Sequence, residues 1–358
     1  MRTTVFVKGC PLRCGWCSNP ESQDFGFEIM TRDILCIGCG RCVAVCPQQA
    51  ISIESLSSNK TVFSIKETSC QMRGSDFQDE DAEGSIEDID DSKTVFRLKQ
   101  SSCQIPSGGV NEPEEEDITD KVDKINIEKD FVRIIDRSKC DQCLKCVEAC
   151  PAKAIIVAGE EKTVREVMNV VIRDRSFYRR SKGGMTICGG EPLSQWEFSL
   201  DLLKDAKKKG IHTALDTTGF AKWKVFEKLL EYSDLVLYDV KHTNSEKHKK
   251  ATGVPNELIL ENLSKAVKKT TVWIRRVIIP GVNDSDEEAK ALAVLAASLD
   301  PKPAKISLLP YHKFGAGKYE SLGREYGYAD VQSLTDERVQ EIKSIIETFC
   351  DIKVDIGK

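Results

Sequence analysis

The sequence predicts an α/β protein built on a parallel sheet, into which a small α+β domain rich in cysteine is inserted. From about residue 162 onward, short apolar segments alternate with amphipathic helical segments, which is typical of parallel α/β sheets. Polar residues gather where those apolar segments end, and α/β proteins build their sites at the carboxyl ends of strands. Eleven of the fifteen cysteines fall into three compact groups, which indicates bound iron and a separate cysteine-rich domain.

The length and charge of the chain limit its possible partners. Its 358 residues suffice for one large domain and a smaller one. The net charge of −5 provides no basic field for nucleic acid or an anionic membrane. We find no long apolar run that could span a membrane and no signal peptide at the start of the sequence. We therefore expect a cytoplasmic protein, a monomer, whose cysteines are reduced.

The first expected element is an apolar strand, Thr3–Val7, followed by a loop that carries Cys10, Cys14 and Cys17. A [4Fe–4S] cluster normally takes four cysteine ligands, so three on a compact loop leave one iron atom open to another ligand. A zinc knot or part of a disulfide framework is the alternative, but no fourth cysteine or histidine stands at zinc spacing nearby. The loop therefore predicts an iron–sulfur cluster at which chemistry takes place.

Two longer cysteine runs follow, each with the spacing C-x2-C-x2-C-x3-C-P that is found in bacterial two-cluster ferredoxins. In such ferredoxins the fourth cysteine of each run binds the other cluster. An apolar segment follows each run, Ala50–Ile53 and Ala154–Val157, as is typical of the small pseudo-twofold ferredoxin fold. The predicted ligand sets are Cys36, Cys39 and Cys42 with Cys150, and Cys140, Cys143 and Cys146 with Cys46.

About 90 residues separate the two runs, whereas a ferredoxin needs only a short connection. Residues 54–129 contain a repeat, Lys60–Gln71 against Lys93–Gln104, and each copy precedes an acidic tract. High acidity with few aromatic residues predicts disorder, with at most a short hairpin from the two Thr-Val-Phe segments. Cys70 and Cys103 could serve as metal ligands or as a redox pair. Alternatively, they have no such role and simply belong to an insertion, which is the interpretation that we favour.

The remainder of the chain alternates helix and strand. We expect helices at Thr163–Tyr178, Gln195–Lys209, Trp223–Tyr232, Leu258–Lys269 and Thr335–Phe349. We expect strands at Met185–Cys188, His212–Leu215, Leu235–Lys241, Thr271–Ile279 and Lys305–Leu309, which with Thr3–Val7 make six. Ser285 and Glu288 predict a capping box for one further helix. Cys188 and Cys350 stand in apolar surroundings and are expected to be buried core thiols.

Residues suited to binding stand at the ends of five of those strands. They are Gly189, Gly190, Glu191 and Pro192; Asp216 and Thr217; Asp239 and Lys241; Arg275 and Val277; and His312. Taken singly, the glycines indicate only a turn, and Lys241 or His312 indicates only a solvated or core residue. Taken together in chain order, these residues predict one site at the carboxyl edge of the sheet.

The stretch Thr4–Ser22, with its C-x3-C-x2-C spacing, resembles the radical S-adenosylmethionine (SAM) superfamily, and within it the glycyl-radical-enzyme activating enzymes. That family includes the pyruvate formate-lyase activating enzyme. The resemblance covers roughly residues 2–52 and 130–325, and it implies a partial (β/α)6 barrel with an inserted ferredoxin-like domain that holds two [4Fe–4S] clusters. Family members have a further stretch before the first strand, so either the start lies upstream or one lip of the active site is missing.

The resemblance also implies roles for the site residues. The open iron of the loop cluster would chelate the amino and carboxylate groups of SAM. The implied contacts are Trp16 with the adenine; Gly189, Gly190, Glu191 and Pro192 with the amino group; Lys241 with the carboxylate; Asp216, Thr217 and Asp239 with a monovalent cation; and His312 with the ribose. Arg275 and Val277 would line the next strand end.

The implied function is the activation of a glycyl radical enzyme. The cofactors would be three [4Fe–4S] clusters and SAM, which is cleaved to methionine and a 5′-deoxyadenosyl radical that removes a glycine α-hydrogen from the partner. Flavodoxin or ferredoxin would donate the electron. One alternative is an iron–sulfur electron-transfer protein with a vestigial barrel. Another is a radical SAM enzyme acting on a small molecule, but such enzymes generally lack the double ferredoxin insert.

The predicted organisation has four parts, because the insert interrupts the barrel after its first strand. They are the first strand with the SAM-cluster loop at 1–30, the ferredoxin-like domain at 31–53 and 130–158, the acidic insertion at 54–129, and the rest of the barrel at 159–358.

Overall fold

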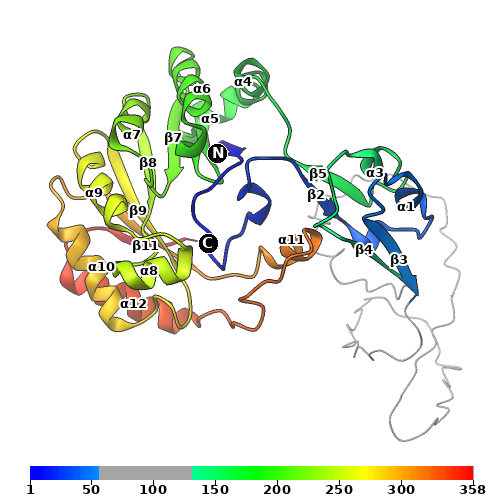
Figure 1. Cartoon of the computed structure of the whole chain (residues 1–358). Helices are drawn as coiled ribbons and strands as arrows, with labels where there is room; N and C mark the ends of the chain where they lie inside the picture. The colour runs from blue at the N-terminus through cyan, green and yellow to red at the C-terminus, as the bar shows by residue number, and fades with distance from the viewer. Residues whose placement is uncertain (56–130, 358) are drawn as a thin grey trace, which may run out of the picture. The chain divides into compact units, whose positions relative to one another are not determined.

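The protein is described by a computed structural model that covers residues 1–55 and 131–357. Its main feature is a sheet of seven strands in the order β1-β6-β7-β8-β9-β10-β11, with every neighbouring pair parallel (Figure 1). Spatial order follows chain order, so each connection within the sheet leads to the adjacent strand. The strands are β1 Arg2–Val7, β6 Gly184–Gly189, β7 His212–Thr217, β8 Leu235–Asp239, β9 Thr271–Ile278, β10 Lys305–Pro310 and β11 Val354–Ile356.

Helices connect these strands and cover the outer side of the sheet (Figure 1). The buried core includes Ile187, Leu215 and Ile274 from the strands, in one cluster with Leu203 and Leu263 from helices α6 and α9. Fully burying a side chain of this size contributes about 1.5–3 kcal/mol. The helices are α4 Val164–Arg173, α5 Arg175–Ser181, α6 Trp196–Lys208, α7 Trp223–Leu230, α8 Ser245–Thr252, α9 Glu257–Ala266, α10 Asp286–Ser298, α11 Ala316–Ser321 and α12 Asp336–Phe349, with short 3-10 turns η1 Pro20–Ser22, η2 Asp33–Leu35 and η3 Pro192–Gln195.

The six predicted strands are confirmed, and the sheet contains a seventh that the sequence did not indicate. Strand β11 has three residues, which are too few for a periodic pattern to be recognised. The single helix predicted at Thr163–Tyr178 is wrong: it is two helices, α4 and α5, because the chain turns at Asp174, where φ is −89° and ψ is 8°. Helix α8 was not predicted because its residues are almost all polar and provide no apolar stripe.

The predicted capping box at Ser285 and Glu288 is half correct. The Ser285 side chain accepts a hydrogen bond from the Glu288 backbone N–H at 3.3 Å and so begins α10. The Glu288 carboxylate turns inward instead, and accepts hydrogen bonds from Thr243 and from the buried Arg276 at 2.7 Å. A buried arginine left without its counter-charge would cost more than one missing bond at an exposed helix end.

The cysteine-rich part contains two short sheets. Strands β2 Glu28–Thr31 and β5 Ile155–Ala158 pair antiparallel, and β3 Ile51–Ser55 pairs with β4 Phe131–Ile135. The apolar segments noted after the two cysteine runs form strands β3 and β5. The strand before each run pairs with the strand after the other run, so the two runs are interleaved. Short helices, α1 Arg41–Val45 and α3 Lys145–Glu148, carry the third cysteine of each run.

Several predictions fall on residues outside the described part of the chain. They concern the repeat and acidic tracts between residues 56 and 129, with the expected hairpin, Cys70 and Cys103. Within residues 1–55 and 131–357, no helix has both the length and the apolar character that crossing a bilayer requires.

Candidate active site

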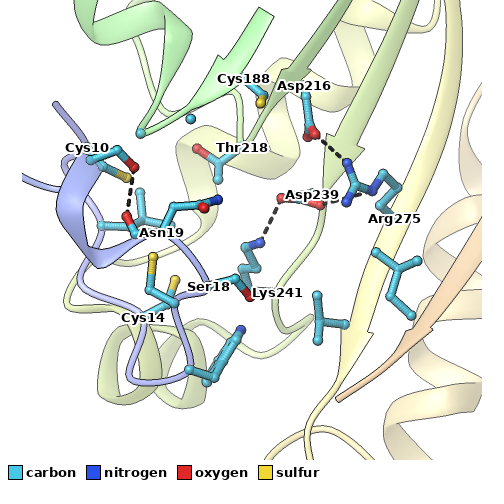
Figure 2. A pocket seen from close by; sticks show the side chains of 18 of the residues that line it. Cys10, Cys14, Ser18, Asn19, Cys188, Asp216, Thr218, Asp239, Lys241 and Arg275 are labelled. Atoms are coloured by element: carbon cyan, nitrogen blue, oxygen red, sulfur yellow. Dashed lines mark hydrogen bonds and ion pairs between the residues drawn. The ribbon is translucent and has the colours of Figure 1, made fainter. Parts of the chain in front are cut away.

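A cavity of about 380 Å³ lies at the carboxyl ends of the strands (Figure 2). The loop that follows β1 lines one side of it, and the ends of β6 to β10 line the other. Of the residues predicted to contact SAM, Pro192 lies elsewhere, as the buried first residue of η3. The predicted residues that line the cavity are Cys10, Cys14, Trp16, Cys17, Gly189, Gly190, Glu191, Asp216, Thr217, Asp239, Lys241, Arg275, Val277 and His312.

The cysteine loop lies close against the end of β6. The Cys10 backbone N–H donates to the Gln23 carbonyl at 2.8 Å, which closes the loop. A Cβ atom at Gly190 would stand 2.4 Å from the Gly9 carbonyl oxygen, and Gly189 has a φ of +111°. Both positions therefore need glycine, one for the close approach and the other for its backbone conformation.

The three thiols of the loop are half-buried and line the same cavity. Burial raises the pKa of Cys10 and of Cys14 to about 12, and the Lys241 ammonium opposes part of that rise at Cys14. Thiols in such surroundings keep their protons at neutral pH unless a metal displaces them. The donor set fits a [4Fe–4S] cluster that binds three thiolates and leaves one iron open.

Across the cavity from these thiols, four charged side chains from the ends of β7, β8 and β9 form ion pairs (Figure 2). Arg275 of β9 bonds to Asp216 of β7, and the Arg275 Nε lies 3.9 Å from Asp239 Oδ1 of β8. The Lys241 Nζ donates to Asp239 Oδ2 at 2.7 Å. Two carboxylates offset two cations, so the group is neutral overall. Asp239 Oδ1 is buried and has no hydrogen-bond partner among the described residues, which leaves one carboxylate oxygen for a ligand.

Burial and neighbouring charges act in opposite directions on the pKa values of these groups. Burial raises the pKa of Asp216 to about 6, although Arg275 opposes the rise. Burial disfavours the charged form of Asp239, but Lys241 and Arg275 outweigh it and lower the pKa of that carboxyl. Against the effect of burial, Asp239 and Cys14 raise the pKa of Lys241. Asp239 and Lys241 are therefore both ionised at neutral pH.

Glu191 is almost completely buried, and its carboxylate is used within the chain. It accepts hydrogen bonds from the Thr217 hydroxyl at 2.5 Å, from the Thr218 N–H and hydroxyl at 2.8 and 2.6 Å, and from the Leu193 N–H at 3.1 Å. Burial raises the pKa of Glu191, and these hydrogen bonds oppose the rise. The side chain thus ties the end of β6 to the end of β7 and holds the glycine turn in place.

A cluster of tyrosines that the sequence did not indicate surrounds Trp16. The Trp16 side chain is 5% exposed, and its ring meets that of Tyr328 edge-on with centroids 5.7 Å apart. The hydroxyls of Tyr311 and Tyr326 are hydrogen-bonded at 2.8 Å in the same buried cluster. Residues 311–328 contain four of the seven tyrosines of the chain, which is the signal that could have revealed the cluster. This packing fixes the Trp16 ring at the cavity wall.

Asn283 fixes the spacing of two strand ends, and the sequence analysis did not single it out. Its Nδ2 donates to the carbonyls of Lys241 and Val277, both at 2.9 Å, and its Oδ1 accepts from the Ile279 N–H at 2.7 Å. Asn283 is 3% exposed. Since both carbonyls belong to residues that line the cavity, Asn283 sets the position of Lys241 relative to Val277. A polar residue in the turn after β9 was the available signal.

The two remaining described cysteines differ from each other. Cys350 is buried in the hydrophobic core, as predicted. The prediction of a core thiol is wrong for Cys188, which is half-buried and lines the cavity near Asp216. Successive side chains of a strand point to opposite faces, so Cys188 lies on the face opposite the buried Ile187.

The two cysteine runs have the same backbone conformation. Left-handed residues stand at positions 38, 40 and 49 of the first run and at the corresponding positions 142, 144 and 153 of the second. The Ala50 N–H donates to the Cys46 sulfur at 3.3 Å, and the Ala154 N–H donates to the Cys150 sulfur at 3.2 Å. Left-handed turns gather backbone N–H groups around anions, and hydrogen bonds to sulfur tune iron–sulfur clusters. Both runs therefore fit anionic, cysteine-bound clusters.

Equivalent cysteines of the two runs also have the same exposure. Cys36 and Cys140 are half-buried, Cys39 and Cys143 exposed, Cys42 and Cys146 buried, and Cys46 and Cys150 half-buried. The small apolar cluster beneath the runs consists of Ile29, Cys42, Ile51, Cys146 and Ile155.

Comparison with protein families finds matches in each of these regions. The radical SAM superfamily matches residues 149–293. A 4Fe-4S dicluster domain matches residues 35–81, and a 4Fe-4S binding domain matches residues 133–156. The radical SAM match covers β6 to β9 of the sheet, and the two 4Fe-4S matches cover the two cysteine runs.

Whole-chain similarity to characterised proteins is extensive. The isethionate sulfite-lyase activating enzyme of Oleidesulfovibrio alaskensis is 37% identical over 95% of this chain and 86% of its own length. The choline trimethylamine-lyase activating enzyme of the same organism is 36% identical, over 98% of this chain and 90% of its own. The benzylsuccinate synthase activating enzyme of Thauera aromatica is 32% identical, over 95% and 82%. A solved domain of a pyruvate-formate lyase-activating enzyme from Bacteroides vulgatus is 34% identical, with a TM-score of 0.42, and covers 49% of this chain and 99% of its own.

Proposed function

The chain belongs to the radical SAM family of glycyl-radical-enzyme activating enzymes, and on that basis we propose how its residues carry out this activity. It binds iron–sulfur clusters and SAM, and it acts on a partner glycyl radical enzyme. Cys10, Cys14 and Cys17 would hold a cluster that would supply one electron for the reductive cleavage of SAM to methionine and a 5′-deoxyadenosyl radical, and that radical would take a hydrogen atom from a glycine α-carbon of the partner. The observation that carries the proposal is the convergence of three loop thiols and ion-paired strand ends in one cavity.

Cys10, Cys14 and Cys17 would hold the loop cluster. Their position beside one another in the cavity supports this role, because a metal ion binds thiolates and displaces the protons that burial favours on these thiols. The close approach of the Gly189–Gly190 turn to the loop would bring backbone groups to the amino group of a ligand on the open iron. Glu191 would support this contact indirectly, because its hydrogen bonds to Thr218 hold the glycine turn in place.

The ion-paired strand ends would receive the charged parts of SAM. Lys241 acts electrostatically on Cys14, so it is suited to the SAM carboxylate at the cluster. Asp239 Oδ1, which accepts no hydrogen bond from the described residues, is suited to a monovalent cation beside SAM. The remaining proposed roles are Asp216 and Thr217 as further cation ligands, Arg275 and Val277 as the wall at β9, Trp16 against the adenine, and His312 at the ribose.

The two cysteine runs would hold two further [4Fe–4S] clusters, which makes three in all. The interleaved strands support an exchange of the fourth ligand, because Cys46 precedes β3 and β3 pairs with the strand that leads into the second run. Likewise, Cys150 precedes β5, and β5 pairs with β2, the strand that leads into the first run. We propose that the residues predicted for this domain, 31–53 and 130–158, belong to it together with the rest of strands β2 Glu28–Thr31 and β3 Ile51–Ser55.

The partner proteins are proposed at the level of their class. The relatives named for isethionate sulfite-lyase and choline trimethylamine-lyase are 37% and 36% identical to this chain. Sequence identity therefore does not indicate which glycyl radical enzyme is the partner. We propose flavodoxin or ferredoxin as the electron donor and a monomer as the working form.

The test is anaerobic reconstitution with iron and sulfide, followed by dithionite and SAM. The readouts are 5′-deoxyadenosine by chromatography and iron in the same sample. The proposal predicts about twelve irons per chain, from three [4Fe–4S] clusters, together with deoxyadenosine. About twelve irons without deoxyadenosine would identify an electron carrier instead, and about eight irons would contradict the three-cluster assignment.

A further inference from the structure

The outer face of helix α5 carries a concentration of positive charge. Residues 173–182 contain five basic residues and one acidic residue, in a chain whose net charge is −5. All five cations are exposed, and none of them forms an ion pair with another residue of the described chain. They are Arg173, Arg175, Arg179, Arg180 and Lys182. Positive charge therefore gathers at this face without an internal counter-charge.

The acidic side chains beside α5 are bound elsewhere. Asp174, the one acid among these residues, is half-buried and accepts a hydrogen bond from the Thr3 hydroxyl at 2.5 Å. On α4, the Glu166 carboxylate accepts hydrogen bonds from the backbone N–H and the hydroxyl of Thr163, both at 2.7 Å. Neither carboxylate pairs with an arginine of α5, so the face keeps its positive charge.

This arrangement of charges does not stabilise the helix. Arg175 and Arg179 stand four residues apart, and like charges at that spacing destabilise a helix by about 0.2–0.5 kcal/mol. Arg175 is also the first residue of α5, where the helix dipole disfavours a cation. Between them, Phe177 is 49% exposed. Exposed arginines around an aromatic side chain are typical of protein interfaces, in which both residue types are enriched.

Helix α5 lies against β1, which is an edge strand of the sheet (Figure 1). The Tyr178 hydroxyl donates to Thr3 Oγ1 of β1 at 2.5 Å. Three residues further along β1, about 10 Å, Phe6 is 58% exposed and stands in register with Cys188, which lines the cavity. The edge strand thus leads from α5 to the cavity, and one interface of about 800 Å² per partner can cover both.

We propose that the outer face of α5 docks an acidic surface of the partner glycyl radical enzyme, with Phe177 inside the contact and Arg175, Arg179 and Arg180 around it. This inference rests on the proposed function, since a protein substrate must lie against the sheet edge while its glycine reaches the cavity. Arginine binds carboxylates through paired N–H donors, so an acidic surface fits the face. An electron donor fits less well, because α5 leads into the amino end of β6 and the cavity lies at the carboxyl end.

The test measures the KM for the partner from the rate of glycyl radical formation, followed by EPR spectroscopy. Dithionite is the reductant, so no protein donor takes part. The probe is the enzyme that the unmodified chain activates among the kinds named by its relatives, beginning with isethionate sulfite-lyase and choline trimethylamine-lyase. Arg179→Glu with Arg180→Glu should raise this KM about tenfold at low salt. High salt should remove the difference, because it screens exposed charges. Deoxyadenosine formation without the partner should not change.

The matched control is Lys222→Glu with Lys224→Glu at the start of α7, which reverses two exposed charges and changes the net charge equally. Its KM for the partner should equal that of the unmodified chain. Phe177→Ser should raise the KM about tenfold at both low and high salt, because an apolar contact is not screened. Should the charge-reversed protein fail to fold, Arg179→Gln with Arg180→Gln decides, with an expected rise of about threefold.

An unchanged KM in the arginine variants, or an equal rise in the lysine control, would overturn the inference. A lower KM would also overturn it, because α5 would then bind a competing acidic segment, such as residues 76–91 of this chain. Failure of the proposed function is a separate outcome. A chain that forms no deoxyadenosine, or that activates none of these enzymes, contradicts the function and the inference with it.

Discussion

The cavity and the two cysteine runs are built in opposite ways. The cavity draws its proposed ligand contacts from positions 10 to 312, and ion pairs between strands hold its charged residues. Each cysteine run is complete within eleven residues, and left-handed turns shape it. The cavity therefore exists only when the whole sheet has formed, whereas the backbone conformation of each run is set mainly within the run, and only the proposed fourth cluster ligand comes from the other run.

This difference sets the size of the effects that substitutions should have. Removing one partner of a fully buried ion pair costs about 3–5 kcal/mol, because it leaves an uncompensated charge. Replacing a glycine in a left-handed turn by a residue with a Cβ adds about 1–2 kcal/mol of backbone strain. Changes at the cavity should thus damage both stability and chemistry, and changes in the turns should affect the runs alone.

Cys14→Ala should have the largest effect, since it removes one of three thiolates from the cavity. SAM cleavage should fall below detection while both runs keep their clusters. The iron content should drop by about four atoms per chain, the content of one [4Fe–4S] cluster. Iron analysis and deoxyadenosine measurement check both points. Cys350→Ala, at a core thiol away from the cavity, is the control and should retain full iron and activity. Unchanged SAM cleavage in Cys14→Ala would refute the assignment of the loop.

The ion pair between Asp216 and Arg275 offers a second way to test the cavity. These side chains keep 21% and 24% exposure, so each single substitution, Asp216→Asn or Arg275→Met, should destabilise by less than a fully buried pair, about 2–3 kcal/mol. Each should also weaken SAM binding. The double variant should lose less than the sum of the two, because no charge is left unpaired. Thermal unfolding and equilibrium SAM binding measure the cycle, and additive losses would show that the pair is not coupled.

Asn283→Ala should have a smaller effect that is confined to SAM. Without the bonds from Asn283, the ends of β8 and β9 can separate, so the KM for SAM should rise about tenfold, which corresponds to about 1.4 kcal/mol. The loss of its three hydrogen bonds should also reduce stability by about 1–3 kcal/mol. Asn262→Ala is a matched control. Its Nδ2 donates to the carbonyls of Gly219 and Ala221 at 2.8 Å, and neither residue lines the cavity.

The control should lose similar stability and keep its KM for SAM. An equal rise of KM in Asn262→Ala would mean that general loosening of the sheet, rather than the position of Lys241, controls binding. Thermal unfolding and initial-rate kinetics on the same preparations separate the two effects.

The spacing of residues along the sequence was enough to predict a site wherever residues close in sequence are also close in the structure. The cysteine runs could be recognised because their spacing along the chain fixes their geometry. Strand ends such as Asp216 and Asp239 could be grouped because parallel strands carry their carboxyl ends to one edge of the sheet.

Features that depend on register and packing could not be predicted in this way. The pairing of Arg275 with Asp216 crosses two strand positions, and nothing in either segment indicates it. The Glu288 side chain does not complete the predicted capping box, because its carboxylate accepts a hydrogen bond from the buried Arg276 instead. Cys188 had an apolar neighbourhood in sequence but points to the cavity, since one residue of register decides the face of a strand.

The smallest predicted effect concerns the turns of the cysteine runs. Gln142 has a φ of 57°, where the first run has Gly38 with a φ of 68°. Gln142→Gly should relieve about 1–2 kcal/mol of left-handed strain and lose about 0.5–1 kcal/mol to the entropy of glycine, for a net gain of about 0.5–1 kcal/mol. Gly40→Ala is the converse, because its Cβ would meet no atom within 4 Å and only the φ of 71° opposes it. It should lose about as much stability as Gln142→Gly gains.

Cluster loss on heating, followed by visible absorption, measures the stability of both variants, and neither substitution should change the KM for SAM. A change in that KM would show that the runs and the cavity are coupled, and the separation between local and long-range construction would no longer hold.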